Sequence, residues 1–205
     1  IADGACDCDG NVDLGCGCGV DGPSGCDETC GSTLADDDCG VCGGDNSSCT
    51  DACGVVNGDG TSCLASLSLG SFDASGSLEV LYDFGGPVAG FQFDVTGLDL
   101  TGASGGAAGD AGMTVSVGGA TVLGFSFTNS EVAAGSGVLT VLSFSGVSDS
   151  STELSMGWSG AITDASGNVY DATASGSIDH GAPDCSGTYY GDAVVDECGV
   201  CGGSG

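Results

Sequence analysis

The sequence predicts an all-β protein, with one antiparallel β-sandwich flanked by irregular, disulfide-rich segments. Two observations lead to this expectation. The 14 cysteines gather towards the two ends of the 205-residue chain, and none lies between Leu64 and Asp184. The middle of the chain instead holds nearly all of the aromatic and β-branched residues. We therefore divide the chain into residues 1–63, 64–182 and 183–205, the last continuing the composition of the first.

The middle region shows the alternation of half-buried strands, in which every second residue is apolar. The runs with this spacing are Leu78 to Phe84, Phe91 to Val95, Met113 to Val117, Phe125 to Phe127, Leu139 to Phe144 and Leu154 to Trp158. Turns rich in Gly, Ser and Asp separate them, at residues 85–87, 102–112, 133–137 and 164–168. Roughly eight or nine short strands without a convincing helix are typical of a sandwich.

An aromatic stripe is expected to form much of the sandwich core. Its members are Phe91, Phe93, Phe125, Phe127, Phe144 and Trp158. The alternative for an exposed Trp or Tyr is a platform for a sugar ring. Tyr189 and Tyr190 lie outside the predicted sandwich, and we expect them to contact a neighbouring subunit or a ligand.

The charge of the chain is entirely negative. There are 29 acidic residues, no Lys or Arg and one histidine, His180, so the formal net charge is -29. Nucleic-acid binding depends on basic side chains that neutralise phosphates, so this class of partner is excluded. No apolar run approaches the ~18 residues of a membrane span. So much uncompensated charge opposes a compact state, and Ca²⁺ is the cation that carboxylate and carbonyl oxygens would bind.

Several acidic clusters are candidate calcium ligands. Asp7, Asp9, Asn11 and Asp13 alternate around a glycine, like the first half of a calcium loop, but no bidentate Glu follows. The further candidates are Asp36, Asp37, Asp38, Asp45, Asn46, Asn57, Asp59, Asp192 and Asp196. The alternative for each cluster is that Asp and Asn are present because turns favour them.

The cysteines predict a disulfide framework in an oxidising compartment, because the segments that hold them have too few apolar residues to fold unaided. The connectivity stays open. Zinc knuckles or redox pairs at the two Cys-x-x-Cys sequences are the weaker alternatives. The cysteines assigned to disulfides are Cys6, Cys8, Cys16, Cys18, Cys26, Cys30, Cys39, Cys42, Cys49, Cys53, Cys63, Cys185, Cys198 and Cys201.

One hexapeptide occurs twice, as CGVCGG at residues 39–44 and again at residues 198–203. Each copy follows acidic residues. The last residues of the chain and its first residues have the same Cys-, Gly- and Asp-rich texture. We therefore expect the chain to be one register of a tandem array or a subunit joined head to tail.

Particular strings of the sequence resemble known families. CGVCGGDNSSC (residues 39–49) resembles the cysteine-rich region of thrombospondin-motif metalloproteases and repeats of secreted bacterial surface proteins. The run from Asp7 to Asp13 resembles thrombospondin type 3 calcium repeats. VAGFQFDVTG (88–97), VLGFSFTNSEVAAGSGVLTVLSF (122–144) and AITDASGNVYDA (161–172) resemble cohesins. This last resemblance implies a jelly-roll sandwich and a dockerin as its partner.

Catalysis is not expected. A zinc protease needs paired histidines, and the sandwich carboxylates have the spacing of solvated strand faces or turns. These are Glu79, Asp83, Asp94, Glu131 and Glu153. Asn46-Ser-Ser is a formal N-glycosylation sequon.

We therefore expect a secreted or cell-surface structural protein without an organic cofactor. It would be a subunit or repeat of a self-assembling fibre, sheath or surface layer held by disulfides and calcium. The alternative is a cohesin-like module that binds a dockerin or a glycan.

Overall fold

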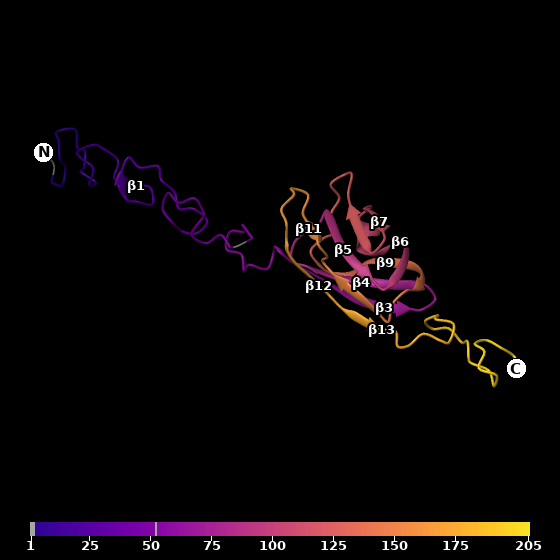
Figure 1. The fold of residues 1–205 in the computed structure, drawn as a ribbon. Helices are drawn as coiled ribbons and strands as arrows, with labels where there is room; N and C mark the ends of the chain where they lie inside the picture. Colours follow the sequence, from indigo (N-terminus) through magenta and orange to yellow (C-terminus); the bar gives the residue numbers. More distant parts are fainter. Residues whose placement is uncertain (1–2, 52) are drawn as a thin grey trace. The chain divides into compact units, whose positions relative to one another are not determined.

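The computed structural model describes residues 3–51 and 53–205 (Figure 1). Its contacts divide the chain into two compact units, residues 1–60 and residues 61–205. The described part of the first unit contains one small hairpin, and the second unit contains the sandwich. The elements are β1 (Pro23–Ser24), β2 (Thr29–Cys30), β3 (Leu64–Asp73), β4 (Ser77–Phe84), β5 (Gly90–Thr96), β6 (Leu98–Ser104), α1 (Gly106–Asp110), β7 (Thr114–Gly118), β8 (Thr121–Phe125), β9 (Gly135–Val147), β10 (Ser151–Ser155), β11 (Ala161–Thr163), β12 (Asp171–Ser175) and β13 (Ser177–Asp179).

Two sheets form the sandwich, which confirms the predicted all-β fold. One sheet has the order β13-β10-β5-β8-β7, with β11 also paired to β5. The other has the order β12-β3-β4-β9-β6 (Figure 1). All pairs are antiparallel except β12 with β3, which run parallel. The chain passes from one sheet to the other between β12 and β13. These two strands are separated by Gly176 alone.

The core is formed by the alternating residues that the sequence analysis identified. On β4, Leu78 and Val80 are fully buried, and Phe93 and Val95 on β5 are fully buried as well. Each such side chain contributes roughly 1.5–3 kcal/mol when it is removed from water. The sandwich therefore has an apolar core of its own, whereas none of the core residues lies in the described part of residues 1–60.

The expected aromatic core is wrong at three positions. Phe125 is only half-buried and does not belong to the core cluster. Trp158 is 101% exposed and Phe127 is 84% exposed. The alternation of β10 ends at Ser155, and Gly157 then turns the chain with a φ of 64°, so Trp158 no longer has an inward position. Phe127 lies beyond the end of β8 and packs only edge-on against Phe125, with 4.8 Å between ring centroids.

Some elements were absent from the expected pattern. The one-turn helix α1 lies inside the stretch expected to be a turn, and β9 begins within residues 133–137. Strands β3, β6, β11, β12 and β13 of the sandwich were not identified, and of β8 only Phe125 lay in an expected run. Their inward positions include small residues, such as the buried Ala65 on β3, which give a weak hydrophobic signal.

The C-terminal segment is attached to the sandwich by His180. This side chain is 8% exposed, and its Nε2 lies 2.7 Å from the hydroxyl of Thr152 on β10. Its Nδ1 lies 2.7 Å from the hydroxyl of Tyr190, and the ring of Phe72 packs on both aromatic partners. The Tyr190 hydroxyl is therefore engaged within its own chain, although 54% of the residue stays exposed.

Across the described residues, no helix is both long enough and apolar enough to cross a membrane.

Candidate functional site: Asp-centred turns and disulfides

Four segments share one hydrogen-bond pattern, and we call each of them an Asp-centred turn. Residue 1 is an aspartate whose Oδ1 accepts the backbone N–H groups of residues 3 and 5. Its Oδ2 accepts the N–H of residue 10. The twelve distances lie between 2.8 and 3.3 Å. The turns begin at Asp37, Asp51, Asp184 and Asp196.

The backbone of these turns is also the same. The N–H of residue 1 donates to the carbonyl of residue 5, and the N–H of residue 4 donates back to the carbonyl of residue 1. Residue 4 is always glycine, with a φ between 75° and 86°, a conformation in which a Cβ is strained. Residue 8 is also always glycine, because a Cβ at this position would collide with the carboxylate of residue 1.

The electrostatics of each turn follow from this geometry. A ring of backbone N–H dipoles stabilises the ionised carboxylate, which lowers the pKa of Asp37, Asp51 and Asp196, with the N–H of residue 5 as the largest cause. The pKa of Asp184 falls to about 2, because the Ser186 hydroxyl donates to it in addition to the backbone. Part of the negative charge is thus compensated without any cation.

The sequence pattern D-x-[CS]-G-[VT]-x-x-G describes all four turns. The repeated CGVCGG identified only the turns that begin at Asp37 and Asp196. The turn at Asp184 was missed because serine replaces cysteine at residue 3, and the turn at Asp51 lacks the second cysteine. The signal that could have found them is the spacing of the aspartate from the two glycines.

The predicted calcium ligands are distributed among such turns. Asp7 accepts the N–H groups of Asp9 and Asn11, and Asp13 accepts those of Gly15 and Gly17. Asp45, Asp59 and Asp192 each occupy residue 9 of an Asp-centred turn, and Asp196 is residue 1 of another. Asn46 and Asp38 bind each other through side-chain and backbone groups, and the Asn57 side chain donates to the carbonyl of Asp38.

Like charge remains within two of the turns. The Asp45 carboxylate raises the pKa of Asp37, and the Asp59 carboxylate raises that of Asp51, each against the stronger effect of the hydrogen bonds. Residues 1 and 9 are thus close enough to repel each other. A cation placed beside both would relieve this repulsion.

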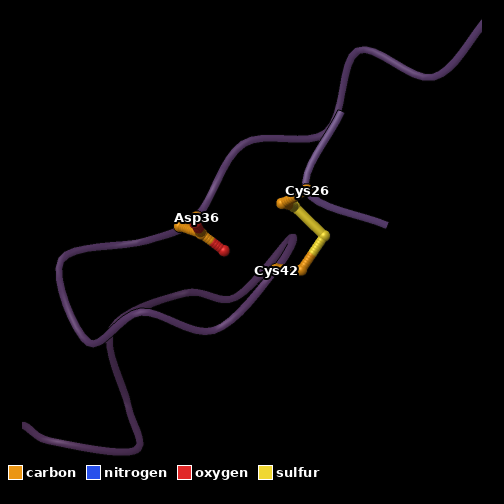
Figure 2. Close-up of side chains that lie close together, drawn as sticks. All are labelled: Cys26, Asp36 and Cys42. Carbon is orange, nitrogen blue, oxygen red and sulfur yellow. A yellow bond between two sulfur atoms is a disulfide. The ribbon is translucent and has the colours of Figure 1, made fainter. Parts of the chain in front are cut away.

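One cluster combines two cysteines with an acid (Figure 2). The ligand atoms of Cys26, Asp36 and Cys42 lie within 4.8 Å of one another, the only such set of three found among the described residues. Figure 2 shows, however, that Cys26 and Cys42 form a disulfide. Their sulfurs are therefore not thiolates, and Asp36 alone cannot hold a metal ion.

Both cysteine-rich segments contain internal disulfides, whose paired Cα atoms lie 5.4–5.6 Å apart. The pairs are Cys6–Cys18, Cys16–Cys30, Cys26–Cys42, Cys39–Cys49 and Cys185–Cys201. Cys53 and Cys63 are disulfide-bonded as well. Cys39, Cys42 and Cys201 each form a disulfide with a cysteine outside their own Cys-x-x-Cys sequence. Neither sequence therefore offers the two thiolates of a zinc knuckle or the internal disulfide of a redox pair.

Cys8 and Cys198 are free and exposed, whereas we expected all 14 cysteines to be paired. The reason is arithmetical and lies in the sequence. Residues 1–63 contain eleven cysteines and residues 183–205 contain three, so each segment has one cysteine that finds no partner within it. The even total concealed two odd counts.

Three of the sandwich carboxylates accept hydrogen bonds from neighbouring groups. Asp94 accepts from Thr121, Glu131 from the N–H of Ala165, and Glu153 from Ser177. Asp83 lines a cavity of about 490 Å³ beside β3 and β12, together with the exposed Asp171. None of these acids is buried.

Known proteins resemble the chain only in part. No protein-family model matches it. A stretch of 42 residues is 57% identical to "A disintegrin and metalloproteinase with thrombospondin motifs gon-1" of Caenorhabditis elegans; it covers 20% of this chain and 2% of that protein. The resemblance to thrombospondin-motif proteins is therefore confined to a short segment.

The sandwich is similar to solved cohesin structures. A non-cellulosomal cohesin from Archaeoglobus fulgidus is 18% identical, with a TM-score of 0.41 over 56% of this chain and 89% of that one. The sixth cohesin of Acetivibrio cellulolyticus scaffoldin B, in complex with a Cel5 dockerin mutant, is 17% identical, with a TM-score of 0.44 over 56% and 97%. The cohesin–dockerin complex Coh-OlpA–Doc918 from Clostridium thermocellum is 11% identical, with a TM-score of 0.41 over 57% of this chain and 98% of that one.

Proposed function

We propose that this chain is an extracellular structural protein. The sandwich is its rigid body, and the Asp-centred turns form the connectors through which successive bodies associate into a fibre, sheath or surface layer. The observation that carries the proposal is the recurrence of one turn on both sides of the sandwich in the sequence. Identical hydrogen bonds begin at Asp37 and Asp51 before it and at Asp184 and Asp196 after it.

The turns have the properties of a connector and not of a binding pocket. Their side chains are mostly exposed and small, and their order comes from backbone hydrogen bonds to one carboxylate and from disulfides. A disulfide limits the unfolded states of a segment that has no apolar core. Oxidised cysteines also support placement outside the cell or at its surface.

Calcium is proposed as the cation that screens the connectors. Carboxylates at residues 1 and 9 repel each other in the turns at Asp37 and Asp51, and Ca²⁺ prefers such oxygen ligands. The disulfides hold each connector together, and the proposed role of calcium is to let the acidic connectors of neighbouring subunits approach each other.

Negative-stain electron microscopy of the purified chain, with and without a calcium chelator, tests the proposal. Filaments or sheets that disperse in chelator are expected. Filaments that persist would retain the structural role and refute the role of calcium. Monodisperse particles under both conditions would refute assembly altogether.

A binding module is the second candidate, and the exposed aromatic residues favour it. Trp158 is completely exposed and Phe127 nearly so, although both belong to the sandwich unit. Exposed aromatic rings are the usual platform for sugar rings, and tryptophan is enriched in protein interfaces. Titration of the monomeric chain with a dockerin module or with soluble polysaccharides, followed by tryptophan fluorescence, tests this role; an unchanged spectrum would refute it.

A further inference from the structure

We propose that Cys198 of one copy of this chain forms a disulfide with Cys8 of the next copy, head to tail. The inference rests on the proposed function and deepens it, because it names the covalent joint between subunits. It is carried by the positions that these two cysteines occupy in an otherwise complete disulfide pattern.

Every other cysteine already has a partner. All 14 cysteines lie within the described residues, and the twelve others are disulfide-bonded. Cys8 and Cys198 are both free and both exposed. In an oxidising compartment, an unpaired exposed thiol in each of two disulfide-rich segments points to a partner outside residues 1–205 of the same copy, and a second copy offers a matching thiol.

Cys198 occupies a position that elsewhere holds a disulfide. It is residue 3 of its Asp-centred turn, and its N–H donates to Asp196, as the N–H of Cys39 donates to Asp37. Cys39 and Cys53, the cysteines at residue 3 of the other turns, are both disulfide-bonded. The same backbone therefore presents the thiol of Cys198 in the same way, but without a partner.

Four disulfides of the first segment overlap along the chain, so that each of the later three begins shortly before the preceding one ends. In chain order they are Cys6–Cys18, Cys16–Cys30, Cys26–Cys42 and Cys39–Cys49. Cys198 precedes Cys201, which closes the Cys185–Cys201 disulfide, as Cys39 precedes Cys42. By its position in this pattern, Cys198 therefore corresponds to a cysteine that begins a disulfide, although its own thiol is free.

Cys8 has the complementary place in this overlap. It follows Cys6, which begins a disulfide, as Cys18 follows Cys16. Cys18 is a cysteine that ends a disulfide, so Cys8 belongs to the same class. One free thiol thus begins a link and the other ends one, which selects pairing of Cys198 with Cys8 over pairing of either cysteine with its own copy.

The coupling is a two-electron oxidation, and a low-molecular-weight disulfide such as oxidised glutathione is the oxidant. The Cys198 thiolate attacks one sulfur of this oxidant, releasing one glutathione thiol and leaving a mixed disulfide. The Cys8 thiolate of the next copy then attacks the Cys198 sulfur and releases the second glutathione thiol. Two protein thiols become one disulfide, and the oxidant becomes two thiols.

Like charge surrounds both thiols. Cys8 lies between Asp7 and Asp9, and Cys198 follows Glu197. The approach of the two ends is therefore opposed by repulsion that salt screens. We expect coupling to be several-fold faster in Ca²⁺ than in chelator at low ionic strength.

The test uses the full chain, the single variants Cys8→Ser and Cys198→Ser, and oxidised glutathione. Remaining thiols are then alkylated, and products are separated on a non-reducing gel. We expect a ladder of multiples of 19.4 kDa for the unaltered chain, monomers for each variant alone and a dimer for the mixed variants. Peptide mapping should identify the Cys198–Cys8 link, with cleavage at acidic residues because trypsin has no site.

Other outcomes overturn the inference. A dimer of one variant alone would show that identical cysteines pair. A monomer without alkylated thiols and without the added mass of bound glutathione would show that the two cysteines join within one chain. Alkylation of both thiols in wild-type chains would show that they do not couple. Filaments seen by microscopy with both thiols alkylated would overturn this joint and leave the proposed structural function intact.

Discussion

Removal of the Cys185–Cys201 disulfide should release the two Asp-centred turns that follow the sandwich. This disulfide closes a loop with a sequence separation of 16. Closing a loop of that size removes conformational entropy from the unfolded segment, which corresponds to about 3 kcal/mol of stability. The segment has no apolar core to compensate, so the double variant Cys185→Ser/Cys201→Ser should lose most of its local order.

Amide hydrogen exchange measures this loss directly. The N–H groups of Thr188 and Val200 lie inside the loop and donate to Asp184 and Asp196. A loss of about 3 kcal/mol should accelerate their exchange by roughly a hundredfold. The matched control is Cys198→Ser, which alters an unpaired cysteine in the same loop and should change the rates little. Unchanged rates in the double variant would show that the carboxylate hydrogen bonds suffice, which would refute this reasoning.

Four further predictions follow from the same contacts. The pKa of Asp184 is about 2, below its ordinary value of 3.8, so its stabilisation is complete above pH 4 and lost as the pH falls towards 2; exchange of the Thr188 amide against pH should show this, and a transition at pH 5 or above would contradict it. Asp184→Asn keeps one acceptor oxygen but replaces Oδ2 by a donor, so the Ala193 amide should exchange faster than that of Thr188; equal acceleration of both would contradict it. Tyr190→Phe removes a hydrogen bond to the buried histidine and should lower the free energy of unfolding by about 1 kcal/mol in urea titration, and no change would contradict it. Trp158→Ala should leave that free energy within about 0.5 kcal/mol, because the side chain is fully exposed; a larger loss in urea would contradict it.

The sandwich could be predicted because its inward positions alternate strongly. Runs such as Leu78–Phe84 and Phe91–Val95 show the period of two directly, and both became central strands. The period was misleading only where a strand ended. Trp158 continued the alternation of β10 in the sequence, but Gly157 reverses the chain before it. The alternation alone therefore does not show where a strand stops.

The connector geometry was less accessible from the sequence. The acidic clusters indicated that Asp residues form turns or bind cations. They did not indicate that Asp37 and Asp51 would each accept three backbone N–H groups. Such bonds join residues up to nine positions apart and depend on two glycines, so neither composition nor charge reveals them. The free thiols, by contrast, were accessible, because counting cysteines by segment gives two odd numbers.

Sedimentation velocity of the purified chain under oxidising conditions tests the structural role most directly. The account predicts species much larger than the 19.4 kDa chain in buffer that contains Ca²⁺ and oxidised glutathione. It also predicts that chelator and reductant together shift them towards the monomer. A single 19.4 kDa species under all of these conditions, with the sandwich folded, would contradict assembly and make a binding module the better account.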